Sequence, residues 1–266
     1  MKSILVVMVS AALVLVACTP NSNKNTMENK SNKNIVAEAY KFMIKEADTS
    51  LVDTYVSDKY LQHSPMVKDG KEGLIQMLNI MKTLPKAGEG PSPIVRIIGE
   101  KDLVVVHLEL TLMGKNLAIM DLFRVENGKL AEHWDVMQEI EEKPIAGDGS
   151  EKVGSLSPKE VEKNRELVDR YFTEMEENPG FAGKSLYSEK CIFHYHPFND
   201  HSLPGIIKVH RVVAEGEFVF VQAKGDKAGK QYVFNFIQRI QAGKVVEEWM
   251  IRQEIPTVMA HSNGMI

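Results

Sequence analysis

The sequence has few of the residues that several common kinds of protein depend on. Its 266 residues include only Cys18 and Cys191 as cysteines, too few for a disulfide scaffold. Neither sign of charge dominates, because 32 Lys and Arg residues stand against 36 Asp and Glu residues, and this balance gives poor support for nucleic-acid binding. Only one long uncharged apolar run occurs, at the extreme N-terminus, which excludes a polytopic membrane protein. With 44% apolar and 26% charged residues, the chain can still build a core.

The apolar run covers residues 4–17 and follows the positive pair Met1-Lys2. It is shorter than the ~20 residues that span a bilayer as a helix, but it suits the core of a signal peptide over residues 1–17. The run ends in Leu15-Val16-Ala17-Cys18, which resembles the bacterial lipobox. That resemblance implies cleavage before Cys18 and lipid on its thiol, so that the protein would be held on a membrane of the bacterial cell envelope, outside the cytoplasm. An ordinary signal peptide with a chance cysteine is the alternative.

The segment that follows, residues 18–33, is rich in Asn and Lys and poor in large apolar side chains. Such a composition cannot bury enough surface to fold, and it predicts a flexible tether. Cys191 would then be the one cysteine without lipid, and we interpret it as a packed small hydrophobic residue rather than a reactive thiol.

The rest of the chain contains an internal repeat. Residues 96–140 align without a gap on residues 211–255, at an offset of 115, with 14 of 45 positions identical. We therefore expect two globular domains, repeat one (34–142) and repeat two (157–256), with a linker at 143–156 and a tail at 257–266.

Within each repeat, helical patterns come first and strand patterns follow. Apolar residues recur at helical spacing in Ile35, Ala39, Phe42 and Met43, and again over 74–81. In repeat two, Ser157-Pro158-Lys159-Glu160 has the pattern of a helix N-cap. Strands are expected at 94–98, 103–112, 117–125 and 130–140, with hairpin turns at Asn127-Gly128 and Ala242-Gly243. This order predicts an α+β fold, with helices packed on a curved antiparallel sheet.

Three motifs of repeat one are similar to a known family. Tyr60-Leu61-Gln62-His63-Ser64-Pro65, Asp121-Leu122-Phe123-Arg124, and the run from Gly128-Lys129 to Trp134-Asp135 resemble the SnoaL-like branch of the NTF2-like superfamily. The resemblance implies two tandem cone-shaped domains, each with a conical cavity. Since domains of this family commonly dimerise through their sheets, it also implies that the two copies pair as an intramolecular pseudo-dimer. It also implies acid/base chemistry by an aspartate without metal or organic cofactor. The same fold hosts cyclases, isomerases, dehydratases and non-catalytic binders, so it does not by itself fix an activity.

Strand alternation gathers polar side chains in the expected cavity of repeat one. His133 and Asp135 lie two apart, so they share a face at a spacing of ~6.6 Å. Asp121 lies on the neighbouring strand. A carboxylate partly removed from water has a raised pKa and can take a proton from an acidic carbon. Asp121 and Asp135 are both candidate bases, and His133 is the candidate donor to the developing oxyanion.

Three further residues are expected to contact a ligand there: His63, in the turn where the resemblance implies a residue at the cavity mouth, His107, one strand behind Asp121, and Arg124. Other interpretations stay open for these side chains. Asp121 and Arg124 could form a structural ion pair, His133 could be a satisfied core histidine, and His107 could be structural. Trp134 and Trp249 recur in both repeats and are interpreted as packing residues.

Repeat two keeps the frame and loses the polar set. At the offset of 115, His133 becomes Glu248, Asp135 becomes Met250, Asp121 becomes Phe236 and His107 becomes Gln222. We expect repeat two to be a degenerate copy and any ligand to bind in repeat one. His194, His196 and His201 could supply metal ligands, but no carboxylate accompanies them at ligand spacing, so no metal site is predicted.

Two functions remain. The first is a cofactor-independent lyase or isomerase, of aldol or cyclase type, acting on a small carbonyl compound in repeat one. The second is a non-catalytic NTF2-like module that binds a ligand or serves as a scaffold at the cell surface. No Gly-x-Ser-x-Gly elbow and no phosphate-binding Gly-rich loop occurs in the sequence, which disfavours nucleophilic and nucleotide chemistry.

Overall fold

The structure is a computed structural model, and it describes residues 30–84, 92–144, 153–178, 185–195 and 205–266. The predicted signal peptide and Cys18 lie outside the described residues. Within the described part of the chain, no helix is both long and apolar enough to cross a membrane.

Repeat one is a five-stranded sheet with helices on one face. The helical elements are α1 (Asn32–Glu38), the π-helix η1 (Ala39–Ile44), the 3₁₀ turn η2 (Thr49–Leu51), α2 (Val52–Tyr55) and α3 (Gly70–Met81). The strands are β1 (Val56–Gln62), β2 (Ile94–Glu100), β3 (Leu103–Leu112), β4 (Lys115–Glu126) and β5 (Lys129–Glu139). Their order in the sheet is β1-β5-β4-β3-β2, and only the β1–β5 pair is parallel.

Repeat two has the same sheet and fewer described helices. One long helix, α4 (Pro158–Glu177), precedes β6 (Tyr187–His194), β7 (Gly205–Glu215), β8 (Phe218–Lys227), β9 (Lys230–Gln241) and β10 (Lys244–Glu254). The order is β6-β10-β9-β8-β7, again with one parallel pair, β6–β10. The predicted α+β class with two tandem cone-shaped domains is confirmed.

Three strands of the two sheets correspond residue for residue. β8, β9 and β10 begin and end 115 residues after β3, β4 and β5, the offset found in the sequence. The turn before the last strand also recurs: Asn127-Gly128 and Ala242-Gly243 both have positive φ at each position. Positive φ at both central residues is the geometry of a tight hairpin turn, and it suits glycine at the second position.

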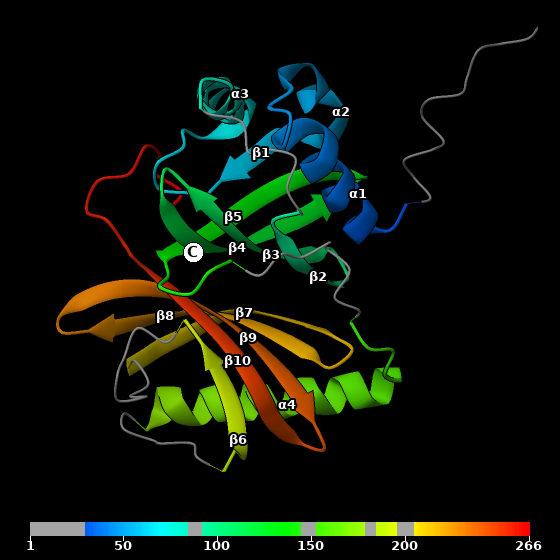
Figure 1. The fold of residues 1–266 in the computed structure, drawn as a ribbon, viewed down its shortest axis with the longest axis vertical. Helices are drawn as coiled ribbons and strands as arrows, with labels where there is room; N and C mark the ends of the chain where they lie inside the picture. Colours follow the sequence, from blue (N-terminus) through cyan, green and yellow to red (C-terminus); the bar gives the residue numbers. More distant parts are fainter. Residues whose placement is uncertain (1–29, 85–91, 145–152, 179–184, 196–204) are drawn as a thin grey trace, which may run out of the picture.

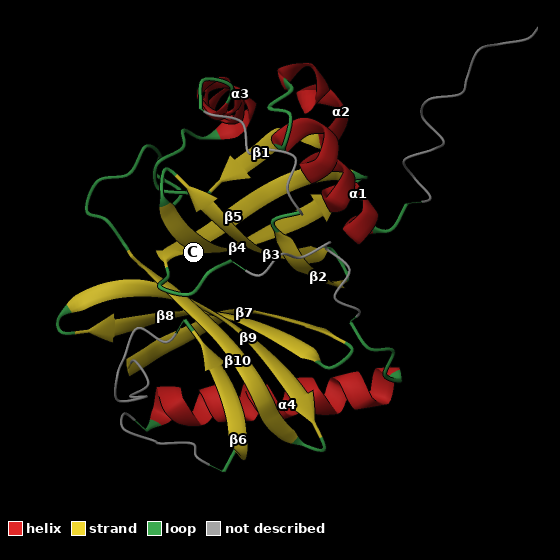
Figure 2. Ribbon diagram, in the orientation of Figure 1, coloured by secondary structure: helices red, strands yellow, loops and turns green. Residues whose placement is uncertain are grey.

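The two sheets face each other, and the helices cover their outer faces (Figure 1). Figure 2 shows the resulting four layers, with α1 to α3 on one outside and α4 on the other. Side chains from both sheets form one shared apolar core, which includes Met120, Leu122 and Trp134 from repeat one and Phe220, Ile237 and Trp249 from repeat two. Each repeat has a second core between its own sheet and helices.

Two helices illustrate what the sequence pattern predicts well and poorly. In α4, Ser157 and Glu160 form the expected capping box, with the Glu160 amide donating to Ser157 Oγ at 3.3 Å and Ser157 N donating to Glu160 Oε2 at 2.9 Å. In repeat one, Phe42 was expected on the buried stripe but is 42% exposed. The helix widens to a π-helix over Ala39–Ile44, which shifts the phase of its buried face.

Candidate functional site

The helix-facing side of the first sheet carries a compact polar cluster. Asp121 on β4 lies directly opposite Asp135 on β5, and His133 projects from β5 to the same side. Apolar residues of the outer core surround them, and the ring of Phe123 stacks on His133 with centroids 4.5 Å apart. Strand alternation therefore brings together the three residues for which the sequence predicted acid/base roles; those roles stay a prediction.

Hydrogen bonds tie the cluster to the helices. The Tyr40 hydroxyl on η1 donates to Asp121 Oδ2, while Asp121 Oδ1 lies 3.5 Å from His133 Nε2. The side chains of His133 and Asp121 are 13% and 12% exposed, so little water reaches the pair. Within the described residues, Asp135 Oδ1 is buried and accepts no hydrogen bond. Asp121 therefore accepts a hydrogen bond through Oδ2 and lies beside His133 Nε2, while His133 Nε2 and Asp135 Oδ1 have no hydrogen-bond partner among the described residues.

Burial and charge shift the proton affinities of this cluster. Burial lowers the pKa of His133, but the hydrogen bond to Asp121 and the charges of Asp121 and Asp135 outweigh it, so the pKa lies above 6.5. Burial raises the pKa of Asp135 above 3.8; His133 opposes this rise, Asp121 adds to it, and a hydrogen bond from Ser64 opposes it. Two groups of raised pKa, a histidine and an aspartate, therefore lie two residues apart on one face of β5.

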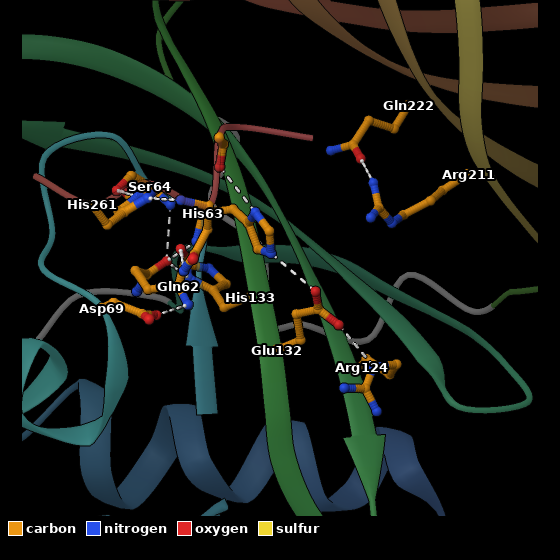
Figure 3. A network of polar contacts seen from close by, with 12 residues as sticks. Gln62, His63, Ser64, Asp69, Arg124, Glu132, His133, Arg211, Gln222 and His261 are labelled. Carbon is orange, nitrogen blue, oxygen red and sulfur yellow. Dashed lines mark hydrogen bonds and ion pairs between the residues drawn. The ribbon is translucent and has the colours of Figure 1, made fainter. Parts of the chain in front are cut away.

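His63 and Arg124 do not reach this cluster. They lie on the other side of the sheet and share Glu132: His63 Nε2 is 2.9 Å from Oε1, and Arg124 Nε donates to Oε2 at 2.8 Å (Figure 3). Burial favours protonation of Glu132, but the hydrogen bonds from Arg124 and His63 outweigh it and hold its pKa below 4.5. The expectation that His63 and Arg124 contact a ligand beside Asp121 is not met by this geometry. The alternative ion pair between Asp121 and Arg124 is also wrong, because Arg124 pairs with Glu132 and Glu126.

His107 also faces away from the expected cavity. It lies opposite Met120 on β4, whose side chain belongs to the core between the two sheets. Its Nδ1 is 2.8 Å from Arg96 Nη1, and its ring lies edge-on to Tyr195 and Trp249 of repeat two. Burial and the Arg96 charge lower its pKa well below 6.5, so it is neutral. Of the two interpretations of His107, the structural one fits this position.

The face between the repeats is built from reciprocal contacts. Arg211 Cζ lies 3.8 Å from the ring centroid of Trp134, and Arg96 Cζ lies 3.7 Å from that of Trp249. His63 stacks on Trp134 at 4.8 Å, and His194 stacks on Trp249 at 4.9 Å. His194, considered above as a metal ligand, is instead held by Glu247 at 2.9 Å; His196 and His201 lie outside the described residues.

Backbone hydrogen bonds repeat the same symmetry. Gln253 Oε1 accepts from Met137 N, and Gln138 Oε1 accepts from Arg252 N, both at 3.0 Å. Glu215 Oε2 accepts from Gly99 N at 2.7 Å, and Glu100 Oε2 accepts from Ala214 N at 2.9 Å. In each case the partners are exchanged at the offset of 115, as in an isologous interface between two copies.

Repeat two has a different buried polar group on its helix side. Glu248, at the position of His133, is fully buried and accepts from Tyr187 Oη at 2.8 Å and Gln238 Nε2 at 2.5 Å. The expectation that the polar set disappears is therefore only half right. Phe236 and Met250 do replace the two aspartates, but a carboxylate remains. Tyr187 comes from the part of the chain before the aligned segment, so the alignment did not reveal it.

A surface groove of about 630 Å³ also lies in repeat two, although we expected any ligand to bind in repeat one. It runs between α4 and the ends of β8 to β10, and its lining includes Lys163, Arg170, Glu217, Gln241 and Gly243. Its charged residues are of both signs, and none of the cluster residues of repeat one reaches it.

Sequence reasoning missed several residues of the repeat-one cluster. Tyr40 was not considered, because the η1 helix was read only for its apolar stripe. Gln62 was read as part of a motif with no role of its own. It is buried, and its Oε1 lies 3.0 Å from His133 Nδ1 (Figure 3). A polar residue at the end of a strand next to a cavity motif was the available signal.

Comparisons with known proteins bear on repeat one. Residues 34–142 match the family model described as SnoaL-like polyketide cyclase. No curated protein matches the chain.

Similar solved structures include TsrD from Streptomyces laurentii, at 19% identity and a TM-score of 0.35, covering 41% of this chain and 90% of that one. An NTF-2 like protein of unknown function from Burkholderia xenovorans LB400 has 19% identity and a TM-score of 0.29, covering 36% and 89%. A steroid delta-isomerase from Pseudomonas aeruginosa has 16% identity and a TM-score of 0.34, covering 41% and 81%.

Proposed function

We propose that the cluster of Asp121, His133 and Asp135 is an acid/base site that moves a proton at a carbon next to a carbonyl group. The observation that carries this proposal is the placement of His133 and Asp135 on one face of β5, with Asp135 Oδ1 buried and without a hydrogen-bond partner among the described residues. The pKa of each of the two side chains is raised. The match of repeat one to the SnoaL-like polyketide cyclase family supports the same class of reaction.

The contacts support different roles for the two aspartates. Asp121 accepts from Tyr40 and lies 3.5 Å from His133 Nε2, so its charge favours the protonated form of His133. Asp135 is the base: its free Oδ1 takes the proton as the C–H bond breaks, and the electron pair moves onto the carbonyl oxygen. His133 Nε2, which has no hydrogen-bond partner among the described residues, donates a hydrogen bond or its proton to that oxygen. Return of the proton to another carbon completes an isomerisation, and attack of the enolate carbon on a second carbonyl completes an aldol closure.

The test uses hydrogen exchange, because it requires only proton abstraction. Purified protein is incubated in D₂O with a panel of small ketones, and deuterium at the α-carbon is followed by NMR. Asp135→Asn should slow the exchange by ~10²–10⁴-fold, the usual contribution of a general base. Met250→Leu, at the equivalent position of repeat two, is the matched control and should leave the rate unchanged. Equal rates for the wild type and Asp135→Asn would refute the assignment.

A non-catalytic ligand-binding module is the second candidate. The observation in its favour is the burial of the cluster, since Tyr40 and Asp121 are each only 8% exposed. The same experiment separates the candidates. No exchange above the uncatalysed rate with any ketone, together with chemical-shift changes in repeat one when a ketone is added, would favour the binding module.

The lipobox sequence supports a further part of the proposal, that lipid on Cys18 holds the protein on a bacterial membrane facing away from the cytoplasm. Cys18→Ser should abolish processing and move the protein out of its normal membrane fraction, whereas Cys191→Ser should do neither. Unchanged processing and fractionation of Cys18→Ser would contradict the anchor.

A further inference from the structure

Gln62 lies at the point where β1 ends and the polar cluster of repeat one begins. It is 1% exposed, and hydrogen bonds reach it from several sides. Its backbone N–H donates to Asp69 Oδ1 at 2.9 Å, and its Nε2 donates to Tyr60 Oη at 3.3 Å. Its Oε1 lies within 3.0 Å of three nitrogens, those of the His63 and Ser64 amides and His133 Nδ1.

These contacts fix the orientation of the Gln62 amide. Backbone N–H groups can only donate, so the atom that receives those of His63 and Ser64 must be the oxygen. His133 Nδ1 faces the same oxygen and must therefore carry a proton. On the other side of the ring, Nε2 faces the Asp121 carboxylate. Acceptors at both ring nitrogens favour the doubly protonated imidazolium over either neutral form.

The residues that hold Gln62 come partly from the other end of the chain. The tail, residues 257–266, leaves β10 and crosses to repeat one (Figure 1). There Asn263 Nδ2 donates to Gln62 O at 3.0 Å, and His261 Nε2 donates to Ser64 O at 2.8 Å (Figure 3). Ala260 N donates to Pro65 O at 2.9 Å. The tail thus fixes both ends of the turn whose first side chain contacts His133.

The described residues of repeat two form no equivalent arrangement. Phe193 pairs with Glu248 as Gln62 pairs with His133 in the first sheet, so a phenyl ring replaces the amide at that position. The amide acceptor of Gln62 is therefore found beside His133, and a residue without an amide stands beside Glu248. This correspondence links Gln62 to His133 rather than to the general frame of the fold.

We propose that Gln62 is a positioning residue that orients His133 as the proton donor of the repeat-one site, and that the tail of repeat two holds Gln62 in place. The inference rests on the proposed function for its purpose, but not for its test. The tail, which follows repeat two, then contributes to the position of His133 in repeat one. Removing the Gln62 acceptor should leave Asp121 as the only acceptor for the ring, so that the neutral form of His133 carries its proton on Nε2.

The experiment follows the histidine ring nitrogens by ¹⁵N NMR over a pH titration of the full-length protein. His133→Gln identifies the His133 signals. In Gln62→Leu, we expect the His133 pKa to fall by about one unit, the size of one hydrogen bond to a charged group, and the neutral tautomer to change from Nδ1–H. In Gln62→Glu, the acceptor stays and gains a charge, so the His133 pKa should rise. This second variant keeps the test decisive if Gln62→Leu does not fold.

The tail is tested in the same titration. Asn263→Ala should move the His133 pKa in the same direction as Gln62→Leu, by less. The matched control is Val258→Ala, because that side chain is 81% exposed, and it should change nothing. If the His133 pKa in both Gln62 variants equals that of the wild type, the role of Gln62 is overturned. If the His133 pKa in Asn263→Ala equals that of the wild type, the role of the tail is overturned.

Ketone exchange rates measured on the same variants separate this inference from the proposed function. A shifted His133 titration without any exchange activity in the wild type would support the positioning by Gln62 and reject the acid/base function. Exchange activity in the wild type, together with an unchanged His133 titration in the Gln62 variants, would support the acid/base function and reject the positioning by Gln62.

Discussion

The two repeats have different polar residues on the helix-facing side of their sheets, but many of the contacts on the side between the sheets are the same in both. On the face between the sheets, the same residue types recur at the offset of 115, and each contacts the other repeat. The pairs of equivalent residues are Arg96 and Arg211, Trp134 and Trp249, and Gln138 and Gln253. On the helix side, Asp121 and Asp135 correspond to Phe236 and Met250. The comparison teaches that contact between the sheets constrains one face in both copies, while the other face is free to differ.

The largest expected effect tests whether the face between the sheets is truly symmetric. Trp134 and Trp249 are each 2% exposed and each contact an arginine of the other repeat. Trp134→Ala and Trp249→Ala should therefore lower the free energy of unfolding by similar amounts, about 3–5 kcal/mol each. Urea unfolding followed by circular dichroism measures both. A loss confined to one variant would break the comparison.

A smaller loss of stability is expected from the two glutamines of the interface, and it tests the same symmetry. Gln138→Ala and Gln253→Ala each leave one backbone N–H of the other repeat without its acceptor, at a cost of about 1–2 kcal/mol. Gln138 also donates to Tyr195 O at 2.9 Å, so Gln138→Ala should be the more destabilising of the two. The same unfolding measurement tests this order, and the reverse order would show that the Tyr195 contact contributes nothing.

The smallest effect concerns the helix side, where only repeat one has the aspartates Asp121 and Asp135. Because burial raises the pKa of Asp135 above 3.8, its protonated form stabilises the fold below pH 3.8, and that contribution is lost as the pH rises through the raised pKa. Asp135→Asn lacks this carboxyl group. Its melting temperature should therefore match that of the wild type below pH 3.8 and exceed it at pH values above the raised pKa of Asp135. Met250→Leu should show the wild-type pH dependence. A wild-type advantage at neutral pH would contradict the assignment.

The sequence predicted the frame of this molecule better than its site, for a physical reason. Strand periodicity and the offset of 115 depend on local spacing, and both agree with the strands of the structure. Periodicity also places Asp121, His133 and Asp135 on one face. It failed for His107 and Phe42, because those predictions required the phase of one strand relative to another and of a helix that widens to π.

The remaining part of the site depends on contacts between distant segments. Tyr40 reaches Asp121 from a separate helix, and the tail reaches Gln62 across 201 residues of sequence. No local pattern carries that information. Glu248 of repeat two was missed as a buried carboxylate for the same reason, since its partner Tyr187 lies on a neighbouring strand.

The reciprocal sheet contacts have a consequence for how the protein responds to dilution. Two separate chains joined through this face would dissociate as their concentration falls, and their melting temperature would depend on concentration. Here both halves of the interface belong to one chain, so association is intramolecular, and its effective concentration is set by the connection rather than by the amount of protein. A single molecule, alone at its location, would therefore keep its sheets paired.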